Sequence, residues 1–403
     1  MKILQINAVY GAGSTGKMAR DISDKLVSSG HQSYVMWAIN CRNEDENTAC
    51  IRIGSTLDHK IHALLYRIFG GQGMYSRHAT RKACKKIKEI SPDVVHLHNL
   101  HSNFIHIPTL FEFLAKHNIP TLITLHDCWF LGGYCMHYKN HNCSNWREDC
   151  RDCPAVSGRF KKTVEKQFAL RRKLYSDFKH LAVNGVSMWT KEAAECSILK
   201  SASRIECIYN WVDTNIFAPR DCADEIKRKY GIPKERKLIL GVSQVWYPEK
   251  GVDTFLYLAE RFSDVADILL VGEDKGVPSA KNIHCIGFAA NTDELVDLYS
   301  AADVLVNASN AETFGLVTAE AMACGTPVVS YSNGGSSELI TDDCGAVVQN
   351  GNKEELAAGI ENVLGQGKTS FAHSCRQRVE NNFAKDKQIE KYIELYIKIS
   401  KKH

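Results

Sequence analysis

Short runs of β-branched and apolar residues alternate along the chain with stretches in which apolar residues recur every three or four positions. The first pattern predicts buried strands, and the second predicts amphipathic helices. Strands that alternate with helices are typical of βαβ units, which build parallel sheets. Because the pattern runs through the sequence twice, we predict an α/β protein with two doubly wound, Rossmann-like domains.

The expected strands fall into two sets, one for each sheet. The strands of the first half are expected at Lys2 to Ala8, Ser33 to Ala38, Val94 to His98, Thr121 to His126 and His180 to Val183, with helices such as Lys17 to Ser29 and Arg77 to Ile90 between them. The strands of the second half are expected at Lys237 to Val242, Asp267 to Val271, Ile283 to Gly287, Val304 to Asn307, Pro327 to Tyr331 and Ala346 to Val348.

The join between the halves is expected at 210–220, where Trp211 and Pro219 interrupt both periodicities. Apolar residues near the end of the chain again recur at helical spacing. We therefore expect an N-terminal domain over residues 1–210, a C-terminal domain over 211–385, and a helix over 386–403 that closes back toward the first domain.

Composition limits the class of protein further. The 403 residues are 44% hydrophobic and 24% charged, which is enough for two buried cores and excludes a disordered or collagen-like chain. No apolar run approaches the roughly 20 residues of a membrane-spanning helix, and the first residues lack signal-peptide features. We therefore expect a cytoplasmic protein, in which most of the fifteen cysteines are reduced, buried or bound to metal.

The net charge of +4 conceals two oppositely charged halves. Lys and Arg minus Asp and Glu is 29 − 17 = +12 for residues 1–205 and 21 − 29 = −8 for residues 206–403. Such a basic excess either forms a solvated helix face or attracts anions, for which membrane lipid or a phosphate-bearing substrate is favoured over nucleic acid. The excess is highest where no acidic residue intervenes, at Lys60, Arg67, Arg77, Arg81, Lys82, Lys85, Lys86 and Lys88.

A glycine-rich loop, Gly11 to Lys17, follows the first expected strand. It matches the dinucleotide fingerprint G-x-G-x-x-G and nearly matches a Walker A loop. The second strand, however, ends in Trp37 to Asn40 without an acidic residue for a ribose, and Met18 stands where Walker A needs Ser or Thr. The loop is therefore either a tight turn or a place where backbone N–H groups, such as that of Gly13, approach a phosphate or sugar.

The segment from Asn307 to Ile340 contains Glu312 and Glu320, eight residues apart. A helix that starts near Thr313 would bring both carboxylates toward one side. Its first N–H groups could hold a diphosphate, and a carboxylate two turns deeper could accept both hydroxyls of a ribose. Two surface glutamates would be the default for this spacing, but the glycines around them favour a site.

These features together resemble retaining glycosyltransferases of family 4, which have the GT-B fold. The resemblance covers nearly the whole chain, and a four-cysteine loop after His126-Asp127-Cys128-Trp129 is similar to the branch that builds capsule, exopolysaccharide and lipopolysaccharide. The motifs that carry it are Gly11 to Gly16, Leu125-His126-Asp127, Asn210 to Asp213 with Phe217, Glu249 to Asp253, Glu312 to Glu320, and Gly334-Gly335.

The resemblance implies that the domain over 1–210 binds the acceptor and that the domain over 211–385 binds the nucleotide sugar. It also implies a role for each matched residue. Glu320 would bind the ribose, and Glu312 would contact the donor sugar. The backbone of Phe314, Gly315 and Leu316, together with Gly13, would contact the sugar and diphosphate.

Two further roles, at Lys250 and His126, follow from the resemblance. Lys250 would stabilise the departing phosphate, but Val245 replaces the Arg that the family usually carries five residues earlier. His126 would contact the sugar, whereas a hydrogen-bonded histidine at a strand end is the alternative from position alone. No obvious nucleophile is present, which is typical of a front-face reaction, and catalysis would need no cofactor or metal.

The cysteine-rich loop over 128–159 is expected to lack regular structure. Four of its cysteines could close a tetrahedral structural zinc site, with buried reduced thiols or labile disulfides as the alternatives. These cysteines are Cys135, Cys143, Cys150 and Cys153.

We therefore predict a hexosyltransferase-type, retaining enzyme that uses a nucleoside-diphosphate sugar, and a UDP-sugar is the favoured donor. Its acceptor would be a glycan, lipid-linked at the inner face of the cell membrane, and nucleic acid is not expected as a partner. The rival predictions are a nucleotide-binding enzyme that uses the Gly11 to Lys17 loop, a catalytically silent GT-B scaffold, and a GT-B phosphorylase or sucrose-type synthase.

Overall fold

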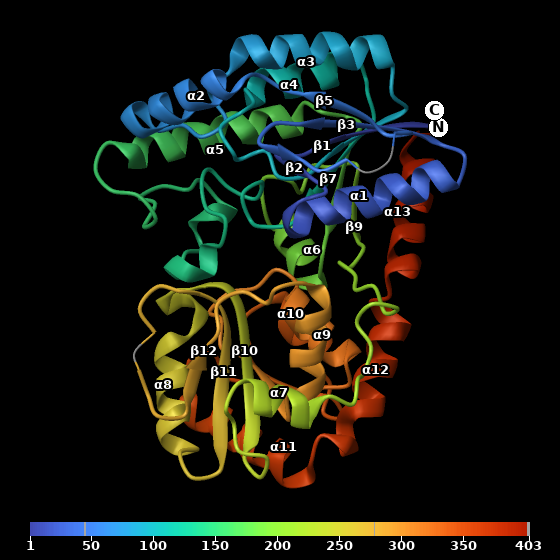
Figure 1. Cartoon of the computed structure of the whole chain (residues 1–403). Coiled ribbons are helices and arrows are strands. Elements are labelled where there is room, and N and C mark those ends of the chain that lie inside the picture. The colour runs from blue at the N-terminus through green and yellow to red at the C-terminus, as the bar shows by residue number, and fades with distance from the viewer. Residues whose placement is uncertain (44–45, 278, 401–403) are drawn as a thin grey trace. The chain divides into compact units, whose positions relative to one another are not determined.

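The computed structural model describes residues 1–43, 46–277 and 279–400. The chain divides into two compact units, which are described separately below (Figure 1). Unit 1 contains Met1–Ile208 together with the chain from Ile389 onward, and unit 2 contains Tyr209–Gln388. All but the first four residues of the last helix, Lys385–Ser400, thus belong to the same unit as the N-terminus.

Unit 1 is built around a parallel sheet of seven strands in the order β5-β3-β1-β6-β7-β8-β9. The order reverses direction at β1, which gives the doubly wound arrangement. Strands β2 and β4 pair with each other in a separate, two-stranded sheet. The strands are β1 Lys2–Ile6, β2 Val9–Tyr10, β3 Gln32–Trp37, β4 Asn40–Cys41, β5 Ala49–Arg52, β6 Val94–Leu97, β7 Thr121–Leu125, β8 Leu181–Gly185 and β9 Arg204–Cys207.

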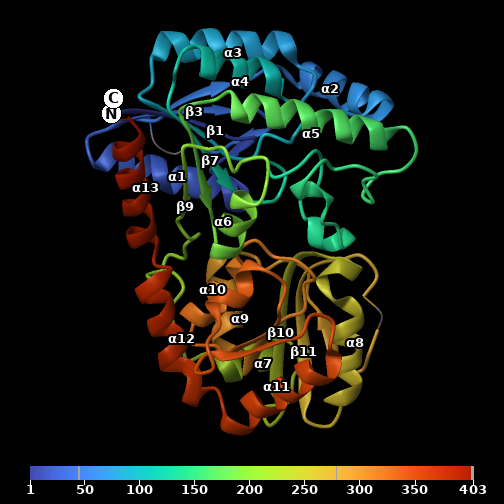
Figure 2. The same ribbon diagram turned by 180° about the vertical axis from the view of Figure 1, so that it is seen from behind.

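Helices cover both faces of this sheet, with α3, α4 and α5 on one face and α1 and α13 on the other (Figures 1 and 2). The cysteine-rich loop between β7 and α5 contains two short 3-10 helices. The helices of unit 1 are α1 Gly13–Ser28, α2 Thr56–Phe69, α3 Arg77–Ile90, α4 Ile107–Lys116, η1 Tyr138–His141, η2 Asn145–Arg147, α5 Phe160–Ser176 and α6 Met188–Glu195, with α13 Lys385–Ser400 joining them from unit 2.

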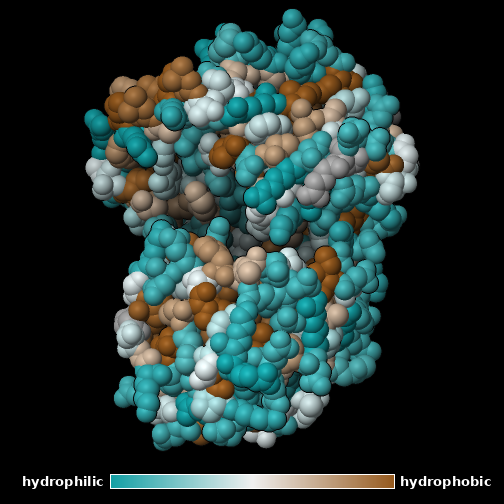
Figure 3. Space-filling model, in the orientation of Figure 1, coloured by the Kyte–Doolittle hydropathy of each residue, from teal (hydrophilic) through white to brown (hydrophobic). Residues whose placement is uncertain are grey.

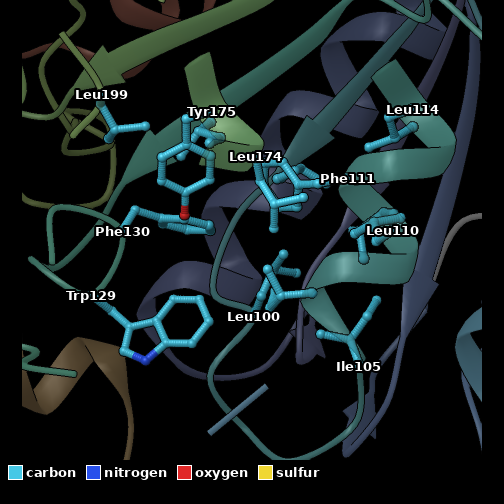
Figure 4. Packing of buried hydrophobic residues seen from close by; sticks show 14 of the residues in the cluster. Leu100, Ile105, Leu110, Phe111, Leu114, Trp129, Phe130, Leu174, Tyr175 and Leu199 are labelled. Atoms are coloured by element: carbon cyan, nitrogen blue, oxygen red, sulfur yellow. The ribbon is translucent and has the colours of Figure 1, made fainter. Parts of the chain in front are cut away.

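The main core of unit 1 lies between the sheet and helices α4 and α5. Phe111 of α4 packs against Tyr175 of α5, with ring centroids 5.2 Å apart, and Trp129 and Phe130 of the cysteine-rich loop reach the same core (Figure 4). All four rings are at most 2% exposed, so the start of that loop is fixed by the core.

The last helix contributes two buried tyrosines to unit 1. The hydroxyl of Tyr396 lies 2.7 Å from Nδ1 of His96 in β6. The hydroxyl of Tyr392 accepts a hydrogen bond of 2.8 Å from Nδ2 of Asn184 in β8. Because both tyrosines are at most 1% exposed, the end of the chain completes the first unit.

Unit 2 contains a parallel sheet of six strands in the order β12-β11-β10-β13-β14-β15. Its strands are β10 Lys237–Trp246, β11 Ala266–Asp274, β12 Ile283–Cys285, β13 Val304–Asn307, β14 Val328–Tyr331 and β15 Gly345–Val348. Its helices are α7 Ala223–Lys229, η3 Pro248–Lys250, α8 Val252–Arg261, α9 Thr292–Ala301, α10 Leu316–Ala323, η4 Gly335–Leu339, α11 Lys353–Gln366 and α12 Thr369–Asn382.

The predicted fold class, two doubly wound α/β units with parallel sheets, is confirmed. The helix at Arg77–Ile90 and the strand at Val304–Asn307 have the predicted bounds. Strand β10 continues four residues past the predicted Val242 by pairing with β11 through an irregular register. In the part of the chain that the structure describes, no helix combines the length and apolarity that crossing a bilayer requires.

Candidate functional site

Glu312 lies in the loop before helix α10, and its position is set by backbone pairing. Its backbone forms a bridge with Gly334: the N–H of Glu312 donates to the carbonyl of Asn333 (3.1 Å), and the N–H of Gly335 donates to the carbonyl of Glu312 (2.9 Å). Helix α10 begins three residues later than expected, at Leu316. Only Glu320 is on the helix, and Glu312 is held instead by the loop that follows β14.

Gly315 explains where α10 starts. Its φ of +88° lies in the left-handed region, which a side chain rarely adopts. A Cβ at this position would lie 2.3 Å from the Cβ of Ser336, so the loop after β14 passes directly over it. The helix that follows presents its first N–H groups, which have no partners within the helix, at the end of β13.

Lys250 and Glu312 form a half-buried ion pair, with Nζ 2.7 Å from Oε1. Lys250 ends η3, and Gly251 behind it has a φ of +83°. A Cβ on Gly251 would lie 2.5 Å from the carbonyl oxygen of Ala308. This close approach brings the loop after β10 against the loop after β13, and so brings the cation to the carboxylate.

Glu320 is held from behind by a tyrosine of α9. The hydroxyl of Tyr299 donates to Oε2 of Glu320 over 2.8 Å, and the Tyr299 ring is fully buried. Burial and the adjacent Glu320 carboxylate raise the pKa of Tyr299 well above its ordinary value, so the hydroxyl remains a donor. The protein therefore holds the Glu320 carboxylate through one of its two oxygens, Oε2.

A buried amide network connects these loops. Nδ2 of Asn307, at the end of β13, donates to the hydroxyls of Thr318 and Ser336, each over 3.2 Å. The Ser336 hydroxyl donates to Oδ1 of Asn333, whose Nδ2 donates to the carbonyl of Ser309. Since Asn307, Asn333 and Ser336 are at most 4% exposed, the loops around Glu312 and α10 form one rigid group.

In unit 1, two glycines of the first loop have different structural roles. Both have positive φ, +65° at Gly11 and +63° at Gly13. A Cβ on Gly11 would lie 2.1 Å from the carbonyl of Arg42, whereas a Cβ on Gly13 would have no neighbour within 4 Å. Gly11 is required by the fold of unit 1, and the space beside Gly13 at the start of α1 is open within that unit.

His126 follows β7 and is joined to a chain of buried hydrogen bonds. Its Nε2 lies 2.9 Å from Nδ1 of His98, and Nε2 of His98 lies 2.9 Å from Oε1 of Gln5 in β1. Nε2 of Gln5 donates to the carbonyl of Ala19, over 2.9 Å, which fixes the orientation of the amide. Burial holds the pKa of His98 well below its ordinary value and lowers that of His126 to about 4, so both rings are neutral.

These contacts determine the tautomer of His126. Oε1 of Gln5 can only accept, so His98 must donate from Nε2, and a neutral imidazole has only one N–H. Nδ1 of His98 therefore accepts, and Nε2 of His126 donates to it. His126 is left with an unprotonated Nδ1, which is an acceptor.

The carboxylate next to His126 is part of a separate contact. Burial alone would raise the pKa of Asp127, but the hydrogen bond from Nε2 of His101 (2.9 Å) and the N–H of Trp129 (2.8 Å) lower it below its usual value. Asp127 is therefore ionised, and it fixes the turn that begins the cysteine-rich loop.

The structure does not support the predicted zinc site at Cys135, Cys143, Cys150 and Cys153. These side chains line one small cavity, and Sγ of Cys150 accepts the N–H of Gly133 (3.4 Å). Among residues 1–43, 46–277 and 279–400, no three His, Cys, Asp or Glu side chains are grouped to hold a metal ion. The four cysteines are free thiols, of which Cys150 and Cys153 are buried, whereas Cys135 and Cys143 are partly exposed.

Solved structures share this fold over the whole chain. Sucrose-phosphate synthase from Thermosynechococcus elongatus matches with a TM-score of 0.70 and 18% identity, covering 99% of this chain and 98% of that one. Anabaena Alr3699/HepE, in complex with UDP and glucose, matches with a TM-score of 0.67 and 16% identity, covering 98% and 99%. The fold is that of the GT-B glycosyltransferases.

Sequence comparison gives the family. The model of "Glycosyltransferase Family 4" matches residues 15–216, half of the chain, and that of "Glycosyl transferases group 1" matches residues 223–382. The protein belongs to glycosyltransferase family 4 and is a transferase.

Curated relatives agree with this family. The putative colanic acid biosynthesis glycosyl transferase WcaC of Escherichia coli is 21% identical over 98% of this chain and 99% of its own length. N-acetyl-alpha-D-glucosaminyl L-malate synthase of Bacillus anthracis is 27% identical over 49% of this chain, and the match spans about half of that relative, 55%. Relatives of this protein thus include one named for polysaccharide biosynthesis.

Sequence reasoning missed three residues of the site. Tyr299, His98 and Gln5 each contact a predicted site residue or its neighbour, but they lie far from it along the chain. One signal in the sequence could have indicated the contact between His98 and His126. Each histidine directly follows an expected strand, and adjacent parallel strands end at the same edge of a sheet. Val245 lies in β10 opposite Glu273 of β11, so this position provides no second positive charge.

Proposed function

We propose that the protein is a retaining glycosyltransferase that transfers a sugar from a nucleoside-diphosphate sugar to a glycan acceptor in cell-surface polysaccharide synthesis. The observation that carries the proposal is the Lys250–Glu312 ion pair in the loops before α10, with Glu320 about one turn into that helix. A UDP-sugar is the favoured donor, and structures of the similar protein HepE contain UDP and UDP-glucose.

The donor diphosphate would lie between Lys250 and the first N–H groups of α10, as the resemblance of Phe314, Gly315 and Leu316 to the family motif implies. A helix N-terminus carries about half a positive charge, and the ammonium adds a full one. When a donor binds, the diphosphate would compete with Glu312 for Lys250, which frees this carboxylate to accept hydroxyls of the sugar. The site is then electrostatically matched to the leaving group.

Glu320 would bind the ribose. Tyr299 occupies one of its oxygens, so the carboxylate has a fixed direction before the nucleotide arrives. A carboxylate can accept from both ribose hydroxyls, whereas an amide at this position would offer only one oxygen.

Transfer with retention would proceed on one face of the donor sugar. The bond from the anomeric carbon to the phosphate oxygen breaks, the bond to the acceptor oxygen forms, and the acceptor proton moves to the departing phosphate oxygen. Lys250 and α10 stabilise the charge that develops on that phosphate. The imidazole of His126 and the backbone of Gly13 would position the sugar through hydrogen bonds with its hydroxyls.

The acceptor is proposed to be a lipid-linked glycan at an anionic membrane surface. This part of the proposal is supported by the excess positive charge of residues 1–205. It predicts that sedimentation with vesicles at low salt favours anionic over neutral lipid, and an equal distribution would remove it.

The donor proposal is tested by thermal unfolding with UDP, GDP, ADP, CMP, ATP and NAD, for the parent and a Glu320→Ala variant. A ligand that binds only the folded state raises the unfolding temperature. We expect one nucleoside diphosphate to raise it in the parent and not in the variant. A shift with ATP or NAD alone, kept in the variant, would move the site to the Gly11 to Lys17 loop.

A catalytically silent GT-B scaffold is the second candidate, favoured by one observation. Val245 stands where the family carries a cation, and its strand neighbour Glu273 is acidic. Release of a nucleoside diphosphate from a donor in the presence of acceptor glycan would exclude it.

A further inference from the structure

Helix α2 has its apolar side on the outside. Its exposed side chains recur at helical spacing, which in a globular protein is typical of a buried face. Figure 3 shows the hydrophobic residues gathered over this helix. The exposed fractions are 66% for Leu57, 48% for Ile61, 56% for Leu64, 41% for Ile68 and 61% for Phe69, and these five residues are called the α2 stripe below.

Polar contacts hold the opposite side of α2. His62, which is 1% exposed, lies with Nδ1 2.8 Å from the hydroxyl of Ser76. Arg159 donates to the carbonyl of Ile68 over 2.8 Å. The hydroxyl of Tyr75 donates to the carbonyl of Gly70 over 2.7 Å. The helix is therefore fixed in its orientation without burying the α2 stripe.

The α2 stripe adjoins a predominantly basic surface. All eight Lys and Arg side chains between His59 and Lys88 are exposed, and no Asp or Glu occurs among those residues. Lys82 and Lys86 of α3 line the same hollow as Asp58 of α2, and Lys86 also pairs with Glu89 over 2.6 Å, so the positive charges of this surface outnumber two acidic groups at its edge. A helix with an apolar stripe and basic neighbours is typical of proteins that lie in the interface of an anionic bilayer.

A second apolar feature lies at the C-terminal end of α2. A cavity of about 190 Å³ is lined mainly by apolar atoms, and its residues include Tyr66 and the exposed Arg67 of α2, Val156, and Phe160 and Val164. Apolar cavities of about 150 Å³ accept a molecule such as benzene. This cavity therefore has room for several carbons of a hydrocarbon chain, next to a guanidinium that suits a phosphate.

We propose that α2 is an interfacial membrane helix: the α2 stripe lies among the acyl chains of an anionic bilayer, the basic residues of α2 and α3 contact lipid phosphates, and the cavity beside Tyr66 takes the hydrocarbon chain of one lipid. The inference extends the membrane part of the proposed function from charge alone to a defined apolar contact. It predicts that binding has a component that salt does not remove.

Charge favours a bilayer over other partners. A second copy of the chain would bring two sets of eight like charges together, which opposes association. Nucleic acid would use the basic residues but would gain nothing from five exposed apolar side chains. An anionic bilayer satisfies both features at once.

The test is co-sedimentation of the full chain with vesicles of phosphatidylcholine alone and with an equimolar amount of phosphatidylglycerol, at about 0.1 M and about 1 M salt. We expect the parent to bind the anionic vesicles at both salt concentrations, more weakly at the higher. The Leu64→Gln/Ile68→Gln variant should bind at least about tenfold more weakly at high salt, because two apolar side chains no longer leave water. Both residues are exposed, so the unfolding temperature should be unchanged.

A matched pair of single variants controls for exposed apolar area in general. Phe69→Gln should weaken binding, whereas Phe288→Gln in unit 2, where the ring is 60% exposed, should not. Binding of the double variant equal to that of the parent would overturn the inference, and so would loss of all parent binding at high salt. A concentration-dependent dimer that the double variant abolishes would instead assign the α2 stripe to a second copy.

These outcomes are independent of the donor site. The vesicles contain neither a sugar nucleotide nor an acceptor glycan, so a failure here leaves the thermal shift with a nucleoside diphosphate unaffected. Conversely, a protein that binds vesicles through α2 but shows no such shift would remove the proposed reaction and keep the membrane contact.

Discussion

Nε2 of His126 and Nδ1 of His98 lie 2.9 Å apart at the ends of the adjacent strands β7 and β6. Because Gln5 fixes the proton of His98, and His98 fixes that of His126, the direction of two hydrogen bonds is set by an amide in a third strand. His98 and Gln5 are thus positioning residues for His126.

Replacement of His98 by Phe removes the acceptor for His126 while keeping a flat ring in the core. An unsatisfied buried donor costs about 1–3 kcal/mol, and His126 would be free to change its tautomer. We expect kcat/KM for sugar transfer to fall about tenfold or more. Nitrogen NMR of the imidazole ring should show the change of tautomer in the folded variant directly.

His96→Phe is the matched control for this variant. His96 is also fully buried and contacts Tyr396 and Thr124, but no hydrogen bond links it to His126 in the described network. We expect a similar fall in unfolding temperature and a much smaller fall in kcat/KM. Equal losses of activity in the two variants would assign His98 a purely structural role.

Lys250→Met should remove most of the activity. It takes away the cation proposed to stabilise the departing phosphate, and single groups of this kind are worth about 10²–10³ in kcat. Lys353→Met is the control, since Lys353 pairs with Asp253 over 2.8 Å in the same unit and is about as exposed as Lys250. Steady-state rates of both variants at matched stability provide the measurement, and similar rates would argue against the role of Lys250.

Gly315→Ala should be far more damaging than Gly367→Ala. Both glycines have positive φ, +88° and +81°, so each substitution strains the backbone by about 1 kcal/mol or more. At Gly315, however, the new Cβ would also lie 2.3 Å from Ser336, whereas at Gly367 it meets nothing within 4 Å. We expect Gly367→Ala to keep nucleotide binding and Gly315→Ala to lose it, as measured by calorimetric titration.

Stability should fall as the pH is lowered. Burial lowers the pKa of His126 to about 4, while an unfolded His has a pKa of about 6.5. The unfolded state therefore takes up a proton first, and the stabilisation present above about pH 6.5 is lost as the pH falls toward 4, by about 3 kcal/mol for this one group. Urea unfolding at pH 7 and pH 4.5 measures it, and His126→Gln should reduce the difference.

The sequence predicted the strands and helices whose periodicity is regular, such as Arg77–Ile90 and Val304–Asn307. It misplaced the start of α10, because the positive φ of Gly315 and the loop over it depend on Ser336, which lies on another strand connection. It also could not give the links from Gln5 to His98 and from Tyr299 to Glu320, because these pairs meet only in the folded sheets.

The α2 stripe shows a different limit. Leu57, Ile61, Leu64 and Ile68 have the spacing that is typical of a core-facing helix, yet their side chains are exposed. What decides the orientation is His62 and the carbonyl contacts of Ile68 and Gly70, which no local pattern reveals.

The two tyrosines of α13 also affect when the first unit can finish folding during synthesis. The hydroxyl of Tyr396 is hydrogen-bonded to His96 and that of Tyr392 to Asn184, inside the first sheet. The ribosome adds both tyrosines only after all of unit 2. On the ribosome, the N-terminal unit is therefore the first to emerge and the last to be completed. Until the final helix is released, its strands β6 and β8 expose polar groups that the finished protein buries.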